Sequence, residues 1–315
     1  MAVDQHETLR ALRAIGIRAT PSDAYTVRTA SGDTIRWGRA HRLPTPSDVQ
    51  RDLRRLAPRE RLLYAVPRVT ASLTAAALTD PRLIVVSAAD RVVLADQVKH
   101  DLEDAPAPTA AATKGPPPYG QFALLRALLL AAEPVTQHQL AAATSISQPA
   151  VSNALHALAP LATRNAAGWT LTDVEAAWER ALAVPMNGVT MYWWSNRPLT
   201  EQAAALPNDA LLSGDLAADR IAAWRIPEHV TAYVRAGVDL SRKGFSLGSS
   251  DDYTLSVTVP ADKTVWATAA HAGRPGTADP VITARDVLHT GTTGDQHEAA
   301  DRIRDVVLLP HTRSA

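Results

Sequence analysis

The sequence predicts an α+β protein of several domains: a mixed α/β N-terminal domain, a central winged helix-turn-helix and a C-terminal α+β domain. Its 315 residues exceed what one ordinary core requires. A stretch rich in proline and alanine, which cannot sustain a helix or a β-ladder, interrupts the chain. Helical and alternating apolar patterns occur on both sides of it. The predicted divisions are residues 1–100, the linker 101–118, residues 119–182 and residues 183–315.

Helical and extended patterns are mixed in residues 1–100. A short helix carries Leu9, Leu12 and Ile15, and Gly16 ends it. Ser31-Gly32-Asp33 is a hairpin turn pattern between two short strands. The predicted order is two strands, a helix, a strand, a helix and two strands, at residues 25–29, 34–37, 46–56, 62–66, 72–78, 83–86 and 92–94.

This succession resembles the restriction-endonuclease-like fold, whose chemistry needs metal-binding carboxylates and a lysine. Lys99 is the only lysine in residues 1–100. The strand that should carry an acid-x-lysine triplet instead reads Ile35-Arg36-Trp37-Gly38-Arg39. Because hydrolysis of this kind needs carboxylates to hold Mg²⁺, the resemblance implies an inactive endonuclease-like domain.

Three helices are predicted in the central segment, at residues 121–132, 137–144 and 148–158. Thr136 and Ser147 precede the second and third helices as capping residues, and Pro149 lies in the first turn of the third, where its missing N–H is not needed. The chain turns between these two helices at Ser145-Ile146. Apolar residues at inward-facing spacings predict a helix-turn-helix: Leu140, Ala143, Ile146, Val151, Leu155 and Leu158.

The outward face of the third helix is polar and has no acidic residue that would repel phosphate. Amide, hydroxyl and imidazole groups on such a face can hydrogen-bond base edges in the major groove. Residues 161–164 and 169–171 flank a turn that begins at Asn165 and form the predicted wing. The expected DNA-binding residues are Ser147, Gln148, Ser152, Asn153, His156, Arg164 and Asn165.

Charge is unevenly distributed along a chain whose net charge is zero. Residues 1–100 carry a net +6, whereas residues 119–182 carry a net −1, with Arg126, Arg164 and Arg180 as their only cations. Since phosphate contacts supply most nonspecific affinity, the central segment needs help from a second copy of the chain or from the N-terminal domain. There, Arg51, Arg54 and Arg55 lie close together, with Arg59 and Arg61 nearby. The alternatives are that these arginines form a solvated helix face and that the winged helix serves only packing or dimerisation.

The C-terminal region predicts α+β structure. Strands are expected at residues 189–194, 253–259 and 265–269, the second of them half-buried because apolar and polar residues alternate. Two helices are expected at residues 279–288 and 295–308. Alternation places one of Trp193 and Trp194 in the core and the other on the opposite face.

Several chemical constellations are absent or incomplete. The chain has no cysteine, and its ten histidines form no metal-binding pair. Gly248-Ser249 and Asp251-Asp252 are too close together for a nucleotidyltransferase site and predict a turn. Ser213-Gly214-Asp215 has no partner histidine at motif spacing. We therefore expect no catalytic residue, no metal and no cofactor.

The chain resembles the AbiEi-type antitoxins of type IV toxin-antitoxin systems. The resemblance depends on the domain order, on the segment at residues 212–218 and on Ala278-Asp279-Pro280-Val281 at the start of a late helix. It implies a winged-helix repressor of its own operon whose C-terminal domain counteracts a nucleotidyltransferase-like toxin. In that family the DNA-binding domain is commonly N-terminal, whereas here residues 1–118 precede it.

The sequence-based expectation is a transcriptional regulator that binds double-stranded DNA and is not an enzyme. Residues 1–7 contain acids and no signal-peptide core, and the apolar stretch at residues 122–132 is too short to cross a bilayer, so we expect a cytoplasmic protein without a membrane partner. A homodimer and a toxin are further expected partners. The alternatives are an antitoxin module in which DNA binding is secondary and, third, a nucleic-acid-processing enzyme.

Overall fold

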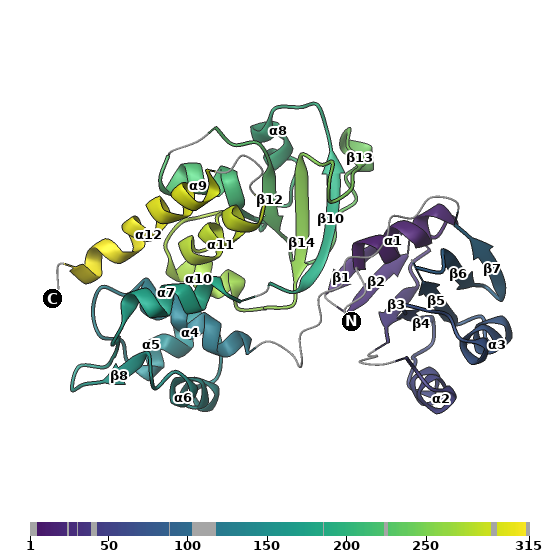
Figure 1. Cartoon of the computed structure of the whole chain (residues 1–315), viewed down its shortest axis with the longest axis horizontal. Coiled ribbons are helices and arrows are strands. Elements are labelled where there is room, and N and C mark those ends of the chain that lie inside the picture. The colour runs from purple at the N-terminus through teal and green to yellow at the C-terminus, as the bar shows by residue number, and fades with distance from the viewer. Residues whose placement is uncertain are drawn as a thin grey trace. The chain divides into compact units, whose positions relative to one another are not determined.

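Two compact units make up the chain (Figure 1). The computed structural model describes residues 5–23, 25–29, 31–38, 43–87, 89–102, 118–184, 186–223, 226–290 and 295–312. Unit 1 contains Met1–Pro116 and Ala236–Asp239, and unit 2 contains Pro117–Arg235 and Leu240–Ala315. Most of the predicted linker, residues 103–117, lies outside the described residues. The molecule is mixed α+β, as the sequence predicts.

Within the described residues, unit 1 is built on a seven-stranded sheet whose strand order follows the chain. Its parallel neighbours are β3 with β4 and β4 with β5, and the other neighbours are antiparallel. The strands are β1 (Ala19–Asp23), β2 (Thr26–Thr29), β3 (Thr34–Trp37), β4 (Glu60–Ala65), β5 (Leu83–Ser87), β6 (Val92–Ala95) and β7 (Val98–Asp101).

Helices lie on both faces of this sheet. α2 (Pro46–Arg54) connects β3 to β4, and α3 (Ala71–Thr79) connects β4 to β5, as parallel neighbours require. Both helices pack on one face, where Leu62 and Val85 belong to their common core. On the other face, α1 (Gln5–Ala14) contacts β1 and β5.

Unit 2 begins with the helical segment that the sequence predicts. Of the six residues expected to face inward, five are buried, and Ile146 packs half-buried against the same core. That core continues into α9, α11 and α12, so residues 119–182 and the C-terminal helices pack as one body. The helices are α4 (Tyr119–Leu129), α5 (Gln137–Thr144), α6 (Gln148–Ala157), α7 (Val174–Leu182), α8 (Leu199–Ala204), α9 (Gly214–Ile221), α10 (Val265–His271), α11 (Pro280–Thr290) and α12 (Gln296–Thr312).

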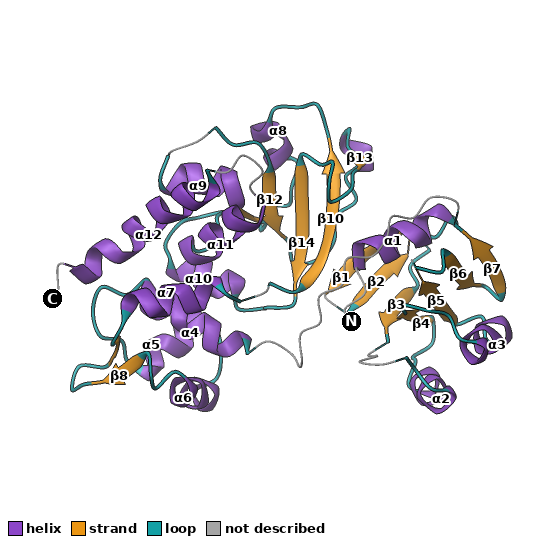
Figure 2. Cartoon of the chain, viewed as in Figure 1, coloured by secondary structure: helices purple, strands orange, loops and turns teal. Residues whose placement is uncertain are grey.

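Two sheets complete unit 2. A two-stranded ribbon pairs β8 (Ala162–Arg164) with β9 (Trp169–Leu171). Figure 2 shows most helices gathered on one side of the unit, with β10, β12 and β14 standing together on the other. In the larger sheet β12 and β14 are parallel and the other neighbours are antiparallel, in the order β11 (Leu211–Ser213), β12 (Val230–Tyr233), β14 (Leu255–Pro260), β10 (Gly188–Trp194) and β13 (Ser246–Leu247).

Two predicted elements of the C-terminal region are wrong in kind or in burial. Residues 265–269 form the helix α10 rather than a strand, because Val265, Thr268 and Ala269 bury one helical face at spacings of three and four. The strand at residues 253–259 was expected to be half-buried. Its counterpart β14 is buried along most of its length, since it lies centrally between β12 and β10.

Two strands without a sequence prediction lie at the edges of the seven-stranded sheet. β1 contains Pro21, which an edge strand tolerates, and β7 is mostly exposed and polar. Neither segment alternates apolar residues, because neither strand buries a whole face: β1 buries one residue and β7 buries none. Among the described helices, not one combines the length and apolar character that a membrane crossing requires.

Candidate nucleic-acid interface

A tight turn joins α5 to α6. Thr136 caps α5 through a capping box: its Oγ1 accepts from the Gln139 N–H at 3.2 Å, and the Gln139 Oε1 accepts from the Thr136 N–H at 2.8 Å. α5 ends at Ser145 in the left-handed region, with φ 54°. Ser147 then caps α6 by accepting from the Ala150 N–H at 3.4 Å. The caps at Thr136 and Ser147 are those that the sequence predicts.

α6 has two chemically different faces. Val151, Ala154 and Leu155 are buried against α4 and α5. On the outward side Gln148, Asn153 and His156 are exposed, and Ser152 is half-buried. Because the helix has no Asp, Glu, Lys or Arg, it presents neutral hydrogen-bonding groups to solvent.

The β8–β9 ribbon after α6 is hydrogen-bonded to the segment that precedes α5. Val135 and Trp169 exchange two backbone hydrogen bonds of 2.8 Å, which pair the extended segment at Val135 with β9 as a third, one-residue strand of the ribbon. Gly168 has φ 153°, and a β-carbon there would lie 2.8 Å from the backbone of Val135. The ribbon therefore depends on glycine at this position.

Arg164 and Asn165 have different surroundings at the ribbon tip. The Asn165 Oδ1 accepts from the backbone N–H groups of Ala167 and Gly168, both at 2.9 Å. Asn165 therefore stabilises the turn and retains only its side-chain N–H groups for a ligand. The Arg164 side chain is exposed and bears the charge of this turn.

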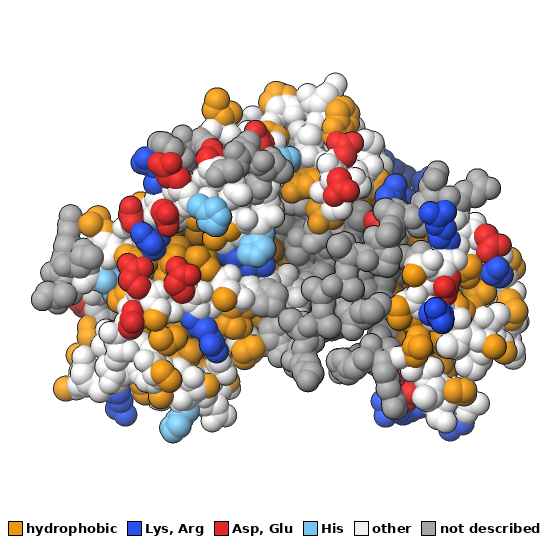
Figure 3. All heavy atoms as spheres, viewed as in Figure 1, with side chains coloured by type: hydrophobic (Ala, Val, Ile, Leu, Met, Phe, Trp, Pro, Cys, Tyr) orange, Lys and Arg blue, Asp and Glu red, His pale blue; other side chains and the backbone are white. Residues whose placement is uncertain are grey.

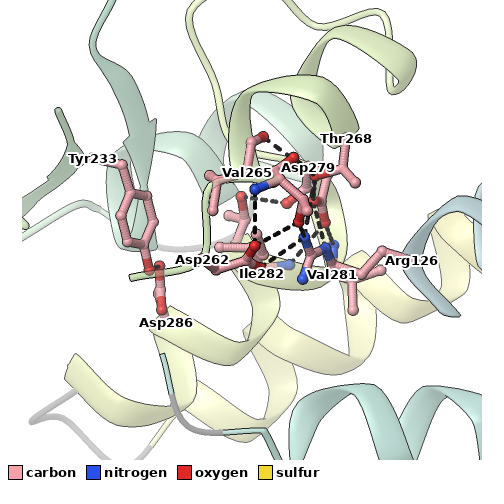
Figure 4. A network of polar contacts seen from close by, with 11 residues as sticks. Arg126, Tyr233, Asp262, Val265, Thr268, Asp279, Val281, Ile282 and Asp286 are labelled. Carbon is pink, nitrogen blue, oxygen red and sulfur yellow. Dashed lines mark hydrogen bonds and ion pairs between the residues drawn. The ribbon is translucent and has the colours of Figure 1, made fainter. Parts of the chain in front are cut away.

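Arg126, counted above among the cations of the central segment, is unavailable to phosphate because it is 4% exposed. Its Nε lies 3.1 Å from the Asp279 Oδ2, and its Nη2 lies 3.2 Å from the Asp262 Oδ2 (Figure 4). Thr264 accepts from the same Nη2 at 2.9 Å. This network joins α4 to the loop before α10 and to the start of α11. The sequence signal was a lone arginine in an apolar helix, which requires a buried counterion.

Asp279 has a structural role in the segment Ala278-Asp279-Pro280-Val281. Its Oδ1 accepts from the N–H groups of Val281 at 3.1 Å and Ile282 at 3.0 Å, so it caps α11 while its other oxygen faces Arg126. The motif is accounted for by helix capping and ion pairing.

Acidic side chains gather away from α6. On the face shown in Figure 3 they cluster over α7 and α12, where Glu175, Glu179, Asp301 and Asp305 are exposed. Three of these carboxylates, those of Glu175, Asp301 and Asp305, form ion pairs with Arg304. The surface formed by α6 and the ribbon is the part of the helical segment that combines exposed polar groups with an exposed arginine and no carboxylate.

In unit 1, α2 places both of its acids in local contacts. Asp48 completes a capping box with Thr45, and hydrogen bonds from Thr45 hold the pKa of Asp48 below its usual value, with Arg51 contributing further. Asp52 accepts from the buried Tyr64 hydroxyl at 2.6 Å. Burial and the bond to Asp52 raise the pKa of Tyr64. The carboxylates of Asp48 and Asp52 therefore both have hydrogen-bond partners within unit 1.

The five arginines of the predicted cluster separate into two groups. Arg51 pairs with Asp48 and Asp52, Arg59 with Asp33, and Arg61 with Asp96. Arg54 and Arg55 are exposed, and no described residue forms an ion pair with either. Together with Arg51 they line a shallow hollow on α2 whose other lining residues are Ser47 and Gln50. Free cationic charge on α2 thus comes from two residues.

A buried polar cluster in unit 2 was not predicted. Ser213 and Tyr233 both donate to the Asp286 Oδ2 at 2.6 Å, and Arg285 donates to its Oδ1 at 2.9 Å. Burial raises the pKa of Asp286, and Arg285 opposes that rise. Ser213 is fully buried, so substrate cannot reach it. Gly248-Ser249 and Asp252 form the predicted turn, in which the Ser249 N–H donates to the Asp252 carbonyl at 3.0 Å.

Within the part of the chain that the structure describes, no three His, Asp or Glu side chains are grouped so that they could hold a metal ion. Comparison with known proteins finds no matching protein family, no matching curated protein and no matching solved structure. The functional argument therefore depends on the geometry of this chain.

Proposed function

We propose that the chain is a sequence-specific DNA-binding regulator and that α4, α5, α6 and the β8–β9 ribbon form a winged helix-turn-helix. The observation that carries the proposal is the outward face of α6, which exposes Gln148, Asn153 and His156 without any charged residue. Amide and imidazole groups on a helix that fits the major groove can read base edges.

The support behind α6 favours a reading role. Its start is capped by Ser147, its inner face is buried, and the preceding helix ends in a left-handed residue that sets the turn. A rigid helix loses little conformational entropy when it binds. In this proposal Gln148, Ser152 and Asn153 contact bases, and Arg164 contacts the backbone from the ribbon.

Phosphate contacts must come largely from elsewhere, since Arg126 is buried. The exposed pair Arg54 and Arg55 on α2 is one proposed source, and a second copy of the chain is the other. The proposal assigns no reaction to the chain, so labelled duplex DNA incubated with the protein and Mg²⁺ should be recovered intact.

The first prediction concerns Asn153. Duplexes selected by the full chain from a random library should share a consensus. Asn153→Ala should weaken binding to that consensus by roughly 1–3 kcal/mol, because one base contact is lost. Binding to an unrelated duplex should not change, since specific hydrogen bonds to base edges do not contribute to nonspecific binding. A gel-shift titration measures both affinities.

Asn208→Ala is the matched control, because it removes an exposed asparagine amide from a loop of the same unit. It should bind the consensus as the unmodified chain does. Selection that returns no consensus, or equal consensus binding by Asn153→Ala and Asn208→Ala, would contradict the proposal.

A protein-interaction module of the antitoxin kind is the competing proposal. It is favoured by Val306 and Leu309, which α12 exposes at 39% and 51% on one side of the helix. In that case Val306→Ser and Leu309→Ser should abolish capture of a nucleotidyltransferase-like partner, and Asn153→Ala should have no effect on it. Tight binding to one DNA site, weakened steeply by salt, favours the regulator instead.

A further inference from the structure

We propose that unit 2 carries a binding site for a phosphate group in a basic hollow between α8 and the turn before β13. The hollow is lined by Arg197, Arg242 and Lys243 as cations, with Glu201 as its one acid and Ala204, Ala205 and Gly244 as its remaining residues. It is a shallow hollow that opens widely to solvent. This site is separate from α6 and independent of the proposed DNA reading.

Two of the cations have no competing partner. Arg197 and Arg242 are exposed, and no described residue forms an ion pair with either, in contrast to Arg36, Arg51 and Arg82 elsewhere in the chain. The Lys243 Nζ donates to the Ala205 carbonyl at 2.7 Å, which holds the ammonium at the rim. Guanidinium groups bind phosphate through paired N–H donors, and a phosphate group has enough charge and acceptor oxygens to engage two of them.

The backbone that carries Arg197 is held by a buried side chain. Gln202 is 1% exposed, and its Nε2 donates to the carbonyls of Ser195 at 3.2 Å and Arg197 at 2.7 Å. Its Oε1 accepts from the Thr254 hydroxyl at 2.8 Å. The segment before α8 is thus fixed to the five-stranded sheet, which positions the start of the Arg197 side chain.

Gly244 lets the turn that carries Arg242 and Lys243 lie close to the Arg197 side chain. It has φ 81°, and a β-carbon at this position would lie 3.0 Å from the Arg197 Nη2. The Ser195 hydroxyl donates to the Gly244 carbonyl at 3.3 Å. Any other residue would strain the turn at this φ and would require the guanidinium to shift by a few tenths of an ångström, so glycine lets Arg197 lie against the turn that carries Arg242 and Lys243.

Glu201 gives the proposal a test of opposite sign. Because its carboxylate lines the same hollow, it opposes an anion, and Glu201→Gln should tighten binding. Arg197→Ala and Arg242→Ala should each weaken it roughly tenfold, since a charge-assisted contact is lost. Calorimetric titration of the full chain with inorganic pyrophosphate at low salt measures all of these affinities.

Arg274→Ala, which removes a half-buried arginine from the segment before α11, is the control and should not alter pyrophosphate binding. Circular dichroism identifies any variant that fails to fold. If Arg197→Ala does not fold, Arg242→Ala tests the same site, because Arg242 lies on an exposed turn. Absence of saturable pyrophosphate binding, or equal binding by Arg242→Ala and Arg274→Ala, would overturn the proposal.

A competition experiment distinguishes a small phosphorylated ligand from the DNA backbone as the source of the phosphate. If unlabelled duplex displaces pyrophosphate and Arg242→Ala weakens binding to any duplex, the phosphate belongs to DNA. If duplex leaves pyrophosphate bound, the hollow takes a small ligand. Either result is independent of Asn153→Ala, so failure of this site and failure of the proposed DNA reading are distinguishable.

Discussion

α2 of unit 1 and α6 of unit 2 are built alike and present opposite chemistry. Each follows a hydroxyl cap, Thr45 or Ser147, carries proline in its first turn and buries apolar residues on one face. α2 exposes arginines, whereas α6 exposes amide, hydroxyl and imidazole groups.

The difference shows that capping and apolar spacing specify a helix without specifying its use. A cationic face suits contact with the phosphates of a nucleic acid whatever its base sequence, and a neutral polar face suits discrimination between bases. Asp48 and Asp52 both pair with Arg51, so the cations of α2 that remain without a described ion pair are Arg54 and Arg55. Three variants or conditions should separate the two helices.

The largest effect is expected from Arg126→Met. It leaves Asp262 and Asp279 buried without their cation, which should lower the free energy of unfolding of unit 2 by about 3–5 kcal/mol. The α6 surface would lose its support, while unit 1 with α2 should remain folded. Urea denaturation followed by far-ultraviolet circular dichroism and by tryptophan fluorescence measures the change.

Arg164→Met is the matched control, since it removes an exposed arginine without a described ion pair. It should change stability by less than about 0.5 kcal/mol. Equal urea midpoints for the two variants would contradict the structural role of Arg126.

An intermediate effect is expected from the double variant Arg54→Ala/Arg55→Ala. If these side chains contact phosphates, binding should weaken roughly tenfold per lost contact near 0.1 M salt, to the same degree on consensus and unrelated duplexes. The salt dependence should also flatten, by about 0.9 in logarithmic slope for each contact. Fluorescence anisotropy titrations at several salt concentrations measure both quantities.

Arg10→Ala/Arg18→Ala removes the same charge from other exposed positions of unit 1 and should have a smaller effect. If it matches the α2 double variant, the general charge of the unit would account for binding, and α2 would have no special role.

The smallest effect concerns acid pH. The pKa of Asp48 is lowered in the folded protein, chiefly by hydrogen bonds from Thr45. Its stabilisation of α2 is therefore present above pH 3.8 and is lost as the pH falls through the lowered value. α6 is capped by the Ser147 hydroxyl and carries no carboxylate, so its start should not respond. Nuclear magnetic resonance of the two helices between pH 5 and 2 measures the difference.

Asp48→Asn is the control for this titration. It should remove the acid response of α2 and leave α6 unchanged. If α6 loosens in step with α2 in the unmodified chain, global acid unfolding rather than the cap would be responsible.

Local patterns were sufficient where one element satisfies its own requirements. The caps at Thr136 and Ser147, the inward residues of α5 and α6, and the turn at Gly248-Ser249 all follow from neighbouring residues. The outward face of α6 was also readable, because a helix repeats every 3.6 residues and its buried side is apolar.

By itself, then, the sequence determined the helices α5 and α6, their caps at Thr136 and Ser147, and which α6 side chains face outward. Tertiary structure decided what lies far apart in the chain: the burial of Arg126 against Asp262 and Asp279, the helical state of residues 265–271, and the hollow that joins Arg197 to Arg242. It also decided that Arg54 and Arg55 form no ion pair with a described residue, whereas Arg51, Arg59 and Arg61 do. The physical reason is that charge pairing and burial depend on contacts across the fold, which local periodicity does not contain.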